Sequence, residues 1–379
     1  MSHQSLEIIG TGIVYRNVKP HVFSRQAYFP SVIHMDNGEL LASLVIGEAF
    51  ESVDADTHIC RSSDDGETWN RPIEILSEKE KENASNCARL TELGNGRLVA
   101  MLVRSLRMDH PNEGLANPEN MGFVPTELML VRSSDYGHTW STPEIIKAPL
   151  VGPSFEACSP IVVLKDGRWI WPTSTWRGWD GYCPSGMKMI ALVSSDEGKT
   201  WPAYMTVMDD SAKGIIYWES KIVELNRGPL VAVAWAYDEK KGSDLPNQYV
   251  LSHDKGNTWT RPASTGILGQ TITLIELQDG GLFAVYRRMD KPGLWVTIAR
   301  LDKDVWVNEV HTCLWGGQDN LLNQKERNMV QEFNELKFGA PAIARLADNS
   351  LFLVFWCYEK MVSNIRWFRL IVENDASAR

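Results

Sequence analysis

The sequence SSDDGETW at residues 62–69 recurs as SSDYGHTW at 133–140, SSDEGKTW at 194–201 and SHDKGNTW at 252–259. Every copy fits S-x-D-x-G-x-T-W, and successive copies begin 71, 61 and 58 residues apart. The Asp carboxylate and the Ser and Thr hydroxyls can accept hydrogen bonds from nearby backbone N–H groups, and Gly can adopt a positive φ. Each copy therefore predicts a tight hairpin turn, and its Trp can pack against a neighbouring unit. Four copies of one pattern predict a repeat architecture.

A second periodic signal lies between these octets. Six segments each consist of an apolar run, a short turn and another apolar run, which is the pattern of two strands joined by a hairpin. After the first four turns an octet follows 24 to 37 residues later, which leaves room for a third strand. We therefore predict an all-β fold, a six-bladed β-propeller of four-stranded antiparallel blades that spans residues 1–379 as a single domain. The blade hairpins lie near residues 37, 95, 166, 227, 279 and 348.

The last two predicted blades depart from the pattern. Blade five has a degraded turn at 302–304, followed by Trp306, where an octet is expected. In blade six the sequence provides only three consecutive strands, the third at about residues 364–372. Residues 6–15 at the N-terminus are the simplest source of its outer strand, because that pairing closes the ring and covers an exposed strand edge.

Two segments interrupt the repeat. Residues 107–125 form a long loop rich in Pro and Asn within blade two, and residues 316–338 contain a stretch for which we predict a short helix between blades five and six. Long insertions in compact domains are often functional lids, and surface decoration is the alternative interpretation.

Composition excludes several classes of function. The net charge of −10 provides no basic surface for nucleic acid. The N-terminal sequence has no basic segment followed by an apolar run, and no stretch reaches transmembrane length, so we expect a cytoplasmic protein without a membrane span. Phosphate-binding, dinucleotide, zinc and serine-nucleophile motifs are absent from the sequence, so we expect no cofactor and no metal. Of the 15 Trp residues, most are expected to pack between blades, and a few exposed ones would suit stacking on sugar rings.

The octet resembles the Asp-box, also called the BNR repeat, and the whole sequence resembles the sialidase superfamily of six-bladed propellers. The resemblance implies that the Asp-boxes lie on the face away from the active site and are structural. It also implies a site at the central opening, formed by the starts of the inner strands and by the loops between the second and third strands. Typical sialidases have there an Arg triad that holds the substrate carboxylate, a Tyr nucleophile assisted by a Glu, and an Asp acid/base.

The sequence departs from that equipment at most positions. The first Arg normally begins an R-I-P triplet, which here is YFP at residues 28–30. The stretch WESKIVEL resembles the usual N-E-P-Q-V-V-E-L and places Glu219 at the Glu position, whereas Trp235 replaces the second Arg. Ala340 stands where the Tyr nucleophile is expected. Because bidentate Arg is the best holder of a carboxylate, these losses argue against ordinary sialidase activity.

The remaining acidic residues suggest a carboxylate mechanism. Glu219 follows two aromatic residues, and an aromatic setting can raise a carboxyl pKa and suit it to acid/base work. The loop at 47–58 contains four acids and one His, of which Asp54 and Asp56 are the predicted general acid or base and His58 a partner. A structural Glu bonded to backbone and a solvated acidic loop are the alternatives. Glu156, ahead of the third inner strand, is a further carboxylate able to face the opening.

Candidate substrate-binding residues occur at equivalent places in several blades. The segment WRGWDGY at 176–182 resembles a sugar-binding platform with polar hooks, and an aromatic loop packed on itself is the alternative. Matching loops of the other blades contribute further Arg and Tyr side chains. The predicted substrate-binding set is His58, Arg104, Arg107, Glu156, Trp176, Arg177, Asp180, Trp218, Tyr237, Arg287 and Arg288.

Three functional hypotheses follow from the sequence. The leading one is a glycoside hydrolase-like enzyme that acts on a non-sialic or modified sugar of a carbohydrate or glycoconjugate, with Glu219 and an acid from Asp54 or Asp56 as the catalytic pair. The second is a polysaccharide lyase on the same fold, which needs a base such as His58, His110 or a Tyr. The third is a non-catalytic carbohydrate- or protein-binding propeller, because fold alone does not decide function.

Overall fold

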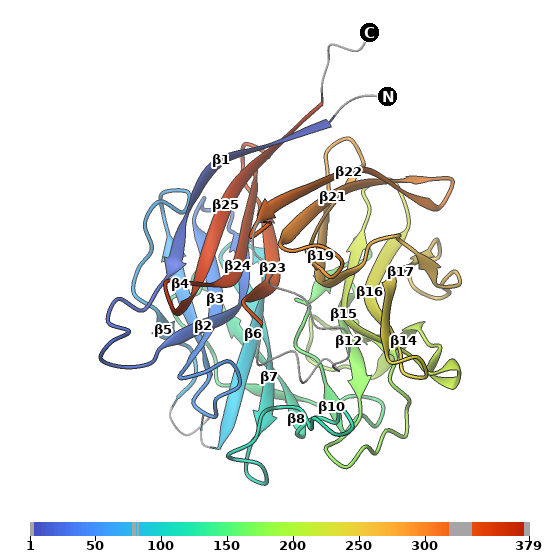
Figure 1. The fold of residues 1–379 in the computed structure, drawn as a ribbon, viewed down its shortest axis with the longest axis horizontal. Coiled ribbons are helices and arrows are strands. Elements are labelled where there is room, and N and C mark those ends of the chain that lie inside the picture. The colour runs from blue at the N-terminus through green and yellow to red at the C-terminus, as the bar shows by residue number, and fades with distance from the viewer. Residues whose placement is uncertain (1–3, 78–80, 82, 318–335, 375–379) are drawn as a thin grey trace.

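The computed structural model describes residues 4–77, 81, 83–317 and 336–374, and this part of the chain consists almost entirely of strands. Six antiparallel sheets are arranged in a ring around a central axis (Figure 1). The predicted all-β fold, a six-bladed β-propeller, is therefore confirmed. Among the elements that the structure describes in full, the one helical segment is a 3-10 turn at Ser211–Lys213. None of the helices in that same part of the chain has the length and apolar character needed to cross a membrane.

The first three blades follow in chain order, each written from its inner to its outer strand. Blade one consists of β2 (Gln26–His34), β3 (Leu40–Gly47), β4 (Asp56–Ser62) and β5 (Ile73–Glu74). Blade two consists of β6 (Ala84–Gly94), β7 (Arg97–Leu106), β8 (Thr126–Ser133) and β9 (Glu144–Ile146). Blade three has a divided inner strand and consists of β10 (Ser154–Phe155), β11 (Val162–Val163), β12 (Trp169–Trp176), β13 (Met189–Ser194) and β14 (Ala203–Met208).

The last three blades include the strand from the N-terminus. Blade four consists of β15 (Ile215–Glu224), β16 (Leu230–Asp238), β17 (Ser243–Ser252) and β18 (Ala263–Ser264). Blade five consists of β19 (Gly269–Glu276), β20 (Leu282–Arg288), β21 (Leu294–Asp302) and β22 (Val305–Trp315). Blade six consists of β23 (Phe338–Arg345), β24 (Leu351–Glu359), β25 (Val362–Asn374) and β1 (Gln4–Tyr15).

The Asp-box octets form the turns between third and fourth strands, as their sequence predicts. In the first octet the Asp64 carboxylate accepts hydrogen bonds from the Thr68 backbone N–H at 2.9 Å and from its hydroxyl at 2.5 Å. Gly66 has a φ of 94°, which a residue with a Cβ rarely adopts. Blade five, which lacks an octet, turns instead through Lys303 and Asp304 with φ values of 48° and 68°. Two consecutive positive φ values match a two-residue type I′ hairpin.

The N-terminal strand closes the ring. β1 pairs antiparallel with β25, with Leu6 opposite Val372 and Ile13 opposite Arg366. Figure 1 shows β1 in blue beside β25 in red, so the first and last parts of the chain share one blade. The prediction that residues 6–15 complete blade six is confirmed.

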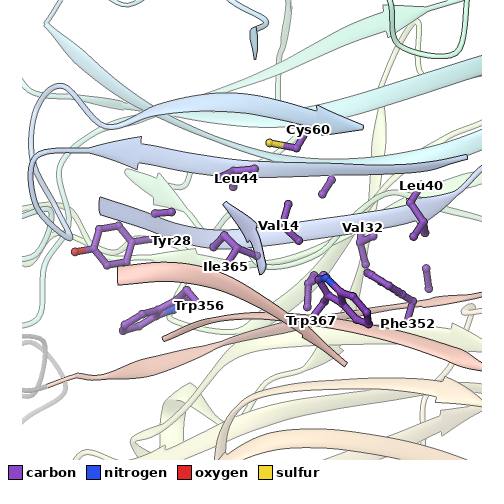
Figure 2. Packing of buried hydrophobic residues seen from close by; sticks show 14 of the residues in the cluster. Val14, Tyr28, Val32, Leu40, Leu44, Cys60, Phe352, Trp356, Ile365 and Trp367 are labelled. Atoms are coloured by element: carbon purple, nitrogen blue, oxygen red, sulfur yellow. The ribbon is translucent and has the colours of Figure 1, made fainter. Parts of the chain in front are cut away.

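The interface between blades one and six contains a continuous hydrophobic cluster (Figure 2). Tyr28 of blade one packs against Trp356 of blade six, with ring centres 5.3 Å apart. Leu44 and Phe352 belong to the same cluster, and all four side chains are almost completely buried. Burial of one such side chain contributes about 1.5–3 kcal/mol, so this contact joins the two ends of the repeat strongly.

The two predicted insertions have different outcomes. The helix predicted within 316–338 falls on residues 318–335, which lie outside the described part of the chain. The loop at 107–125 is described, and it reaches across the face that carries the loops between second and third strands. The interpretation of residues 1–379 as a single domain stays a prediction.

Candidate functional site

A cavity of about 440 Å³ lies at the centre of the ring. Residues from the inner strands of all six blades line it, and most of its wall is apolar. Trp176, Trp218 and Trp235 form a contiguous aromatic wall, with the ring of Trp218 centred 4.8 Å from that of Trp176 and 4.5 Å from that of Trp235. An apolar wall disfavours the charged form of any carboxyl group that faces it.

Four inner strands share an irregularity that points side chains into this cavity. β2, β15, β19 and β23 each contain a β-bulge, and each bulge holds one non-glycine residue with positive φ. Those residues all line the cavity, and they are Phe29, Glu219, Thr271 and Ala340, with φ values of 48°, 48°, 54° and 46°. Bulges re-aim side chains, and a left-handed non-glycine residue costs about 1–3 kcal/mol. Such strain persists at functional sites when the surrounding structure holds it.

Two carboxyl groups meet in the cavity. Glu156 lies in the segment that separates β10 from β11, and its Oε2 accepts a hydrogen bond from the Glu219 backbone N–H at 3.0 Å. Oε2 of Glu219 in turn accepts one from the Thr271 backbone N–H at 2.6 Å. The bulges of blades four and five and the break in blade three therefore position this pair together.

The two carboxyl groups have unequal acidity. Burial and the negative charge of Glu219 raise the pKa of Glu156 to about 8. Burial also raises the pKa of Glu219, but the positive charges of Arg287 and Lys221 and the Thr271 N–H oppose that rise. With a pKa of about 8, Glu156 is the carboxyl group of the pair that retains its proton near pH 7.

Three cationic side chains border the same cavity. The Arg287 Nε donates to Gln270 Oε1 at 2.9 Å and its Nη1 donates to the Phe338 carbonyl at 3.1 Å. Arg89 and Lys221 lie on the inner strands of blades two and four. Burial is the main cause that lowers the pKa of Lys221. Within the described residues, no three His, Cys, Asp or Glu side chains are grouped so as to hold a metal ion.

The family of the chain follows from its sequence. The pattern that defines the BNR repeat-like domain matches residues 54–319, more than half of the chain. The chain belongs to the BNR repeat-like domain family. Together with the six-bladed fold, this match confirms the predicted kinship with the sialidase superfamily of Asp-box propellers.

Solved structures agree on the fold of this BNR-family chain. A protein of unknown function from Dyadobacter fermentans matches with a TM-score of 0.74 and 18% identity, over 97% of this chain and 99% of that one. The NanB sialidase of Streptococcus pneumoniae matches with a TM-score of 0.64 and 13% identity, over 96% and 70%. The intramolecular trans-sialidase of Ruminococcus gnavus matches with a TM-score of 0.64 and 15% identity, over 98% and 99%. A search of curated proteins finds no significant match.

Two of the three family positions that the sequence shows as replaced face the cavity of this BNR propeller. Trp235 stands where the resemblance places the second Arg, and Ala340 stands where it places the Tyr nucleophile. Tyr28 stands at the first Arg position, where it is fully buried and its hydroxyl lies 2.6 Å from that of Tyr358. Trp235 is almost fully buried, and its indole N–H donates to Asp244 Oδ1 at 2.5 Å. The wall that would hold a sialic acid carboxylate is therefore aromatic here.

The acidic loop of blade one presents a different acid from those predicted. Asp54 is exposed and forms an ion pair with Arg25 at 3.4 Å. Asp56 is buried on β4, 3.8 Å from the Lys81 ammonium, and His58 Nδ1 lies 3.0 Å from the Asp56 carbonyl oxygen. The structure places none of these three side chains in the cavity wall.

Glu51 is the residue of this loop that lines the cavity. Its Oε2 accepts a hydrogen bond from the Leu115 backbone N–H at 3.1 Å, and burial raises the pKa of its carboxyl to about 7. The loop contains four acidic residues, and nothing in the sequence indicates which of them faces the cavity. The partner that orients Glu51 lies 64 residues away, in the inserted loop 107–125.

The inserted loop joins two rims of the site. Arg107 donates to the Glu51 carbonyl at 2.8 Å and also bonds the Glu113 carbonyl, so it fixes the loop rather than facing the cavity. His110 stacks on Trp179 with ring centres 3.9 Å apart. The indole N–H of Trp176 donates to the Met121 carbonyl at 2.7 Å. The insertion therefore links the blade-one loop to the segment 176–182.

The predicted platform at 176–182 is only partly in the cavity. Trp176 lines it, whereas Arg177 forms an ion pair with Glu239 at 2.5 Å outside the wall. Asp180 is exposed, and its Oδ1 accepts a hydrogen bond from the Tyr182 backbone N–H at 2.9 Å. The segment thus combines one cavity residue with a rim that packs on the insertion.

The other predicted binding residues divide in the same way. Trp218 and Arg287 line the cavity, and Tyr237 stacks behind Trp218 with ring centres 5.8 Å apart. Arg104 pairs with Glu127 at 3.3 Å and Arg288 with Asp290 at 2.6 Å, both outside the wall. Each of these two arginines forms an ion pair within its own blade and does not face the cavity.

Sequence reasoning missed two cations of the site, Arg89 and Lys221. Arg89 interrupts the apolar run of the second hairpin, and a charged residue within such a run is a signal that could have identified it. Lys221 follows Glu219 by two residues, the spacing of one face of a strand. The bulge between them is what no sequence pattern indicates.

Proposed function

We propose that this protein is a glycoside hydrolase-like enzyme that cleaves a non-sialic or modified sugar from a carbohydrate or glycoconjugate. The observation that carries the proposal is the coupled pair of Glu156 and Glu219 in an aromatic cavity. Glu156, with its pKa raised to about 8, holds a proton near neutral pH, while Arg287 and Lys221 oppose the rise in the pKa of Glu219. A proton donor beside a second carboxyl group is the combination that glycoside hydrolysis requires.

Each carboxyl group has a defined role in the proposed reaction. The Glu156 O–H donates its proton to the glycosidic oxygen as the bond from that oxygen to the anomeric carbon breaks. Glu219, held by the Thr271 N–H, either attacks the anomeric carbon or takes a proton from the attacking water. The first route retains and the second inverts the anomeric configuration, and the product anomer identified by NMR distinguishes them. Water supplies the hydroxyl group of the released sugar in both routes.

The placement of the residues favours this assignment over the original candidates. Asp54 and Asp56 lie outside the cavity wall, so the acid moves from that loop to Glu156. His58 and His110, the bases considered for a lyase, also lie outside the wall. The aromatic side chains of Trp176 and Trp218 supply surfaces on which a sugar ring can stack.

The test is turnover on a panel of chromogenic glycosides that includes a sialoside. We expect cleavage of at least one non-sialic glycoside, and a fall of about 10²- to 10⁴-fold in kcat for Glu156→Gln and for Glu219→Gln. Glu67→Gln, on an exposed Asp-box turn, is the matched control and should retain full activity. Asp54→Asn tests the alternative assignment of the acid. If Asp54→Asn loses turnover while Glu156→Gln keeps it, the general acid is in the blade-one loop and is not Glu156. Full turnover in both Glu156→Gln and Glu219→Gln overturns the proposal.

A further inference from the structure

Two cations from neighbouring blades bind one short segment of blade three. The Arg89 Nε, from β6, donates to the Ala157 carbonyl at 2.7 Å. The Lys221 Nζ, from β15, donates to the Cys158 carbonyl at 2.7 Å. These carbonyls belong to consecutive residues directly after Glu156. Both cationic heads are therefore fixed beside the catalytic pair, at the wall of the cavity.

Each head keeps N–H donors for which the described part of the chain provides no acceptor. Nη1 of Arg89 donates to the Phe29 carbonyl at 2.7 Å and to the Pro30 carbonyl at 3.1 Å, but its Nη2 has no hydrogen-bond partner among the described residues. The Lys221 ammonium has three N–H donors, and besides Cys158 it reaches only the Ser220 carbonyl, at 3.4 Å, within the same part of the chain. Arg89 is only 7% exposed, so its remaining donors have little access to bulk water.

The charge of the wall favours an anion at this place. Arg89, Lys221 and Arg287 all line the cavity, while burial raises the pKa of Glu156 to about 8 and that of Glu51 to about 7. The positive charges of these three side chains all act on Glu219 and oppose the rise of its pKa. The charge of Arg89 also helps to lower the pKa of Lys221, which shows that the two heads repel one another. An anion between like charges in an apolar site relieves that repulsion and replaces lost hydration.

We infer that Arg89 and Lys221 form a subsite for an oxyanion substituent, a carboxylate or a sulfate, on the sugar that lies between Glu156 and Glu219. This inference rests on the proposed function for the presence of a sugar in the cavity. The Nη2 group of Arg89 and the third N–H of Lys221 bind the oxyanion from two blades. The two cations of the subsite come from β6 and β15, and neither stands at Tyr28 or Trp235, where the resemblance places arginines.

Binding without turnover tests the subsite independently of catalysis. The probes are sodium glucuronate for a carboxylate, sodium sulfate for a sulfate, and glucose as the neutral control, measured by calorimetry at constant ionic strength. We expect the wild type to bind at least one anion, and Lys221→Gln and Arg89→Lys to weaken that binding by about tenfold or more. Arg97→Met, whose side chain pairs with Glu197 at 3.6 Å on an exposed surface, should bind as the wild type does.

The outcomes separate the subsite from the proposed reaction. Binding of glucuronate indicates a uronic acid, and binding of sulfate alone indicates a sulfated sugar. Wild-type protein that binds neither anion, or folded Lys221→Gln and Arg89→Lys variants that bind as tightly as the wild type, overturns the inference. If the wild type binds an anion while Glu156→Gln and Glu219→Gln both retain full turnover, that result refutes the proposed catalytic pair but not the subsite. Far-ultraviolet circular dichroism verifies that each variant is folded.

Discussion

Replacing Glu156 with Gln removes a carboxyl group that opposes folding at alkaline pH. Burial and the charge of Glu219 raise its pKa from an ordinary 4.5 to about 8. The folded protein therefore binds this proton more tightly than the unfolded chain does. The stability that this difference contributes is fully present below pH 4.5, and it is lost as the pH rises towards 8. The Gln side chain keeps an oxygen that can accept the Glu219 N–H and does not titrate.

The size of the effect follows from the two pKa values. One pH unit between them corresponds to about 1.4 kcal/mol, which gives an upper value of about 5 kcal/mol over the whole range. Because Glu156 borders a cavity that admits water, solvation of its ionised form reduces this value to about 2–4 kcal/mol. Wild-type protein should lose that much more unfolding free energy than Glu156→Gln between pH 4.5 and 8.5.

Urea unfolding at pH 4.5 and pH 8.5 measures this difference. Glu67→Gln, which changes an exposed Glu on the Asp-box face, is the matched control and should follow the wild type at both pH values. If wild type and Glu156→Gln lose the same unfolding free energy between the two pH values, Glu156 does not carry the raised pKa. The assignment of Glu156 as the protonated acid would then be wrong.

Three further predictions address the fold and the rim. Deletion of residues 1–16 removes β1 and should abolish the cooperative melting transition, so an unchanged transition would show that blade six does not need it. Glu51→Gln should suppress an increase in hydrogen exchange of the 107–125 loop between pH 6 and pH 8.5, because burial gives Glu51 a pKa of about 7, and equal exchange in both proteins would contradict this. Asp135→Asn should lower stability by about 1 kcal/mol at pH 7. Hydrogen bonds from Thr139 hold the pKa of Asp135 at about 2, so this difference should vanish as the pH falls through 2, and a pH-independent difference would refute the role of the charge.

The fold could be predicted because its signals are local and repeated. Asp64 bonds Thr68 within one octet, so five consecutive residues contain these bonds of the turn. The hairpin near residue 227 likewise needs only the residues of β15 and β16. Ring closure by residues 6–15 followed from counting strands and from the cost of an open edge, although the paired strands lie at opposite ends of the sequence.

The site was less accessible because its geometry depends on contacts between blades. Glu219 could be proposed from a motif, but the positive φ that aims it into the cavity comes from a bulge that no motif encodes. Glu51 differs from its acidic neighbours only because Leu115, in another blade, donates a hydrogen bond to it. Arg89 belongs to the site because it donates a hydrogen bond to the Ala157 carbonyl of another blade, a contact that the sequence does not indicate.

The aromatic residues at the replaced family positions and the raised pKa of Glu156 share one physical cause. An arginine at Trp235 would place a positive charge in the cavity wall and favour the ionised form of both carboxyl groups. The aromatic side chains present instead carry no such charge, so burial dominates the pKa of Glu156. The substitutions that remove the means of holding a sialic acid carboxylate therefore also help to keep Glu156 protonated near neutral pH. The same apolar wall therefore lacks an arginine that could hold a carboxylate and favours the protonated form of Glu156.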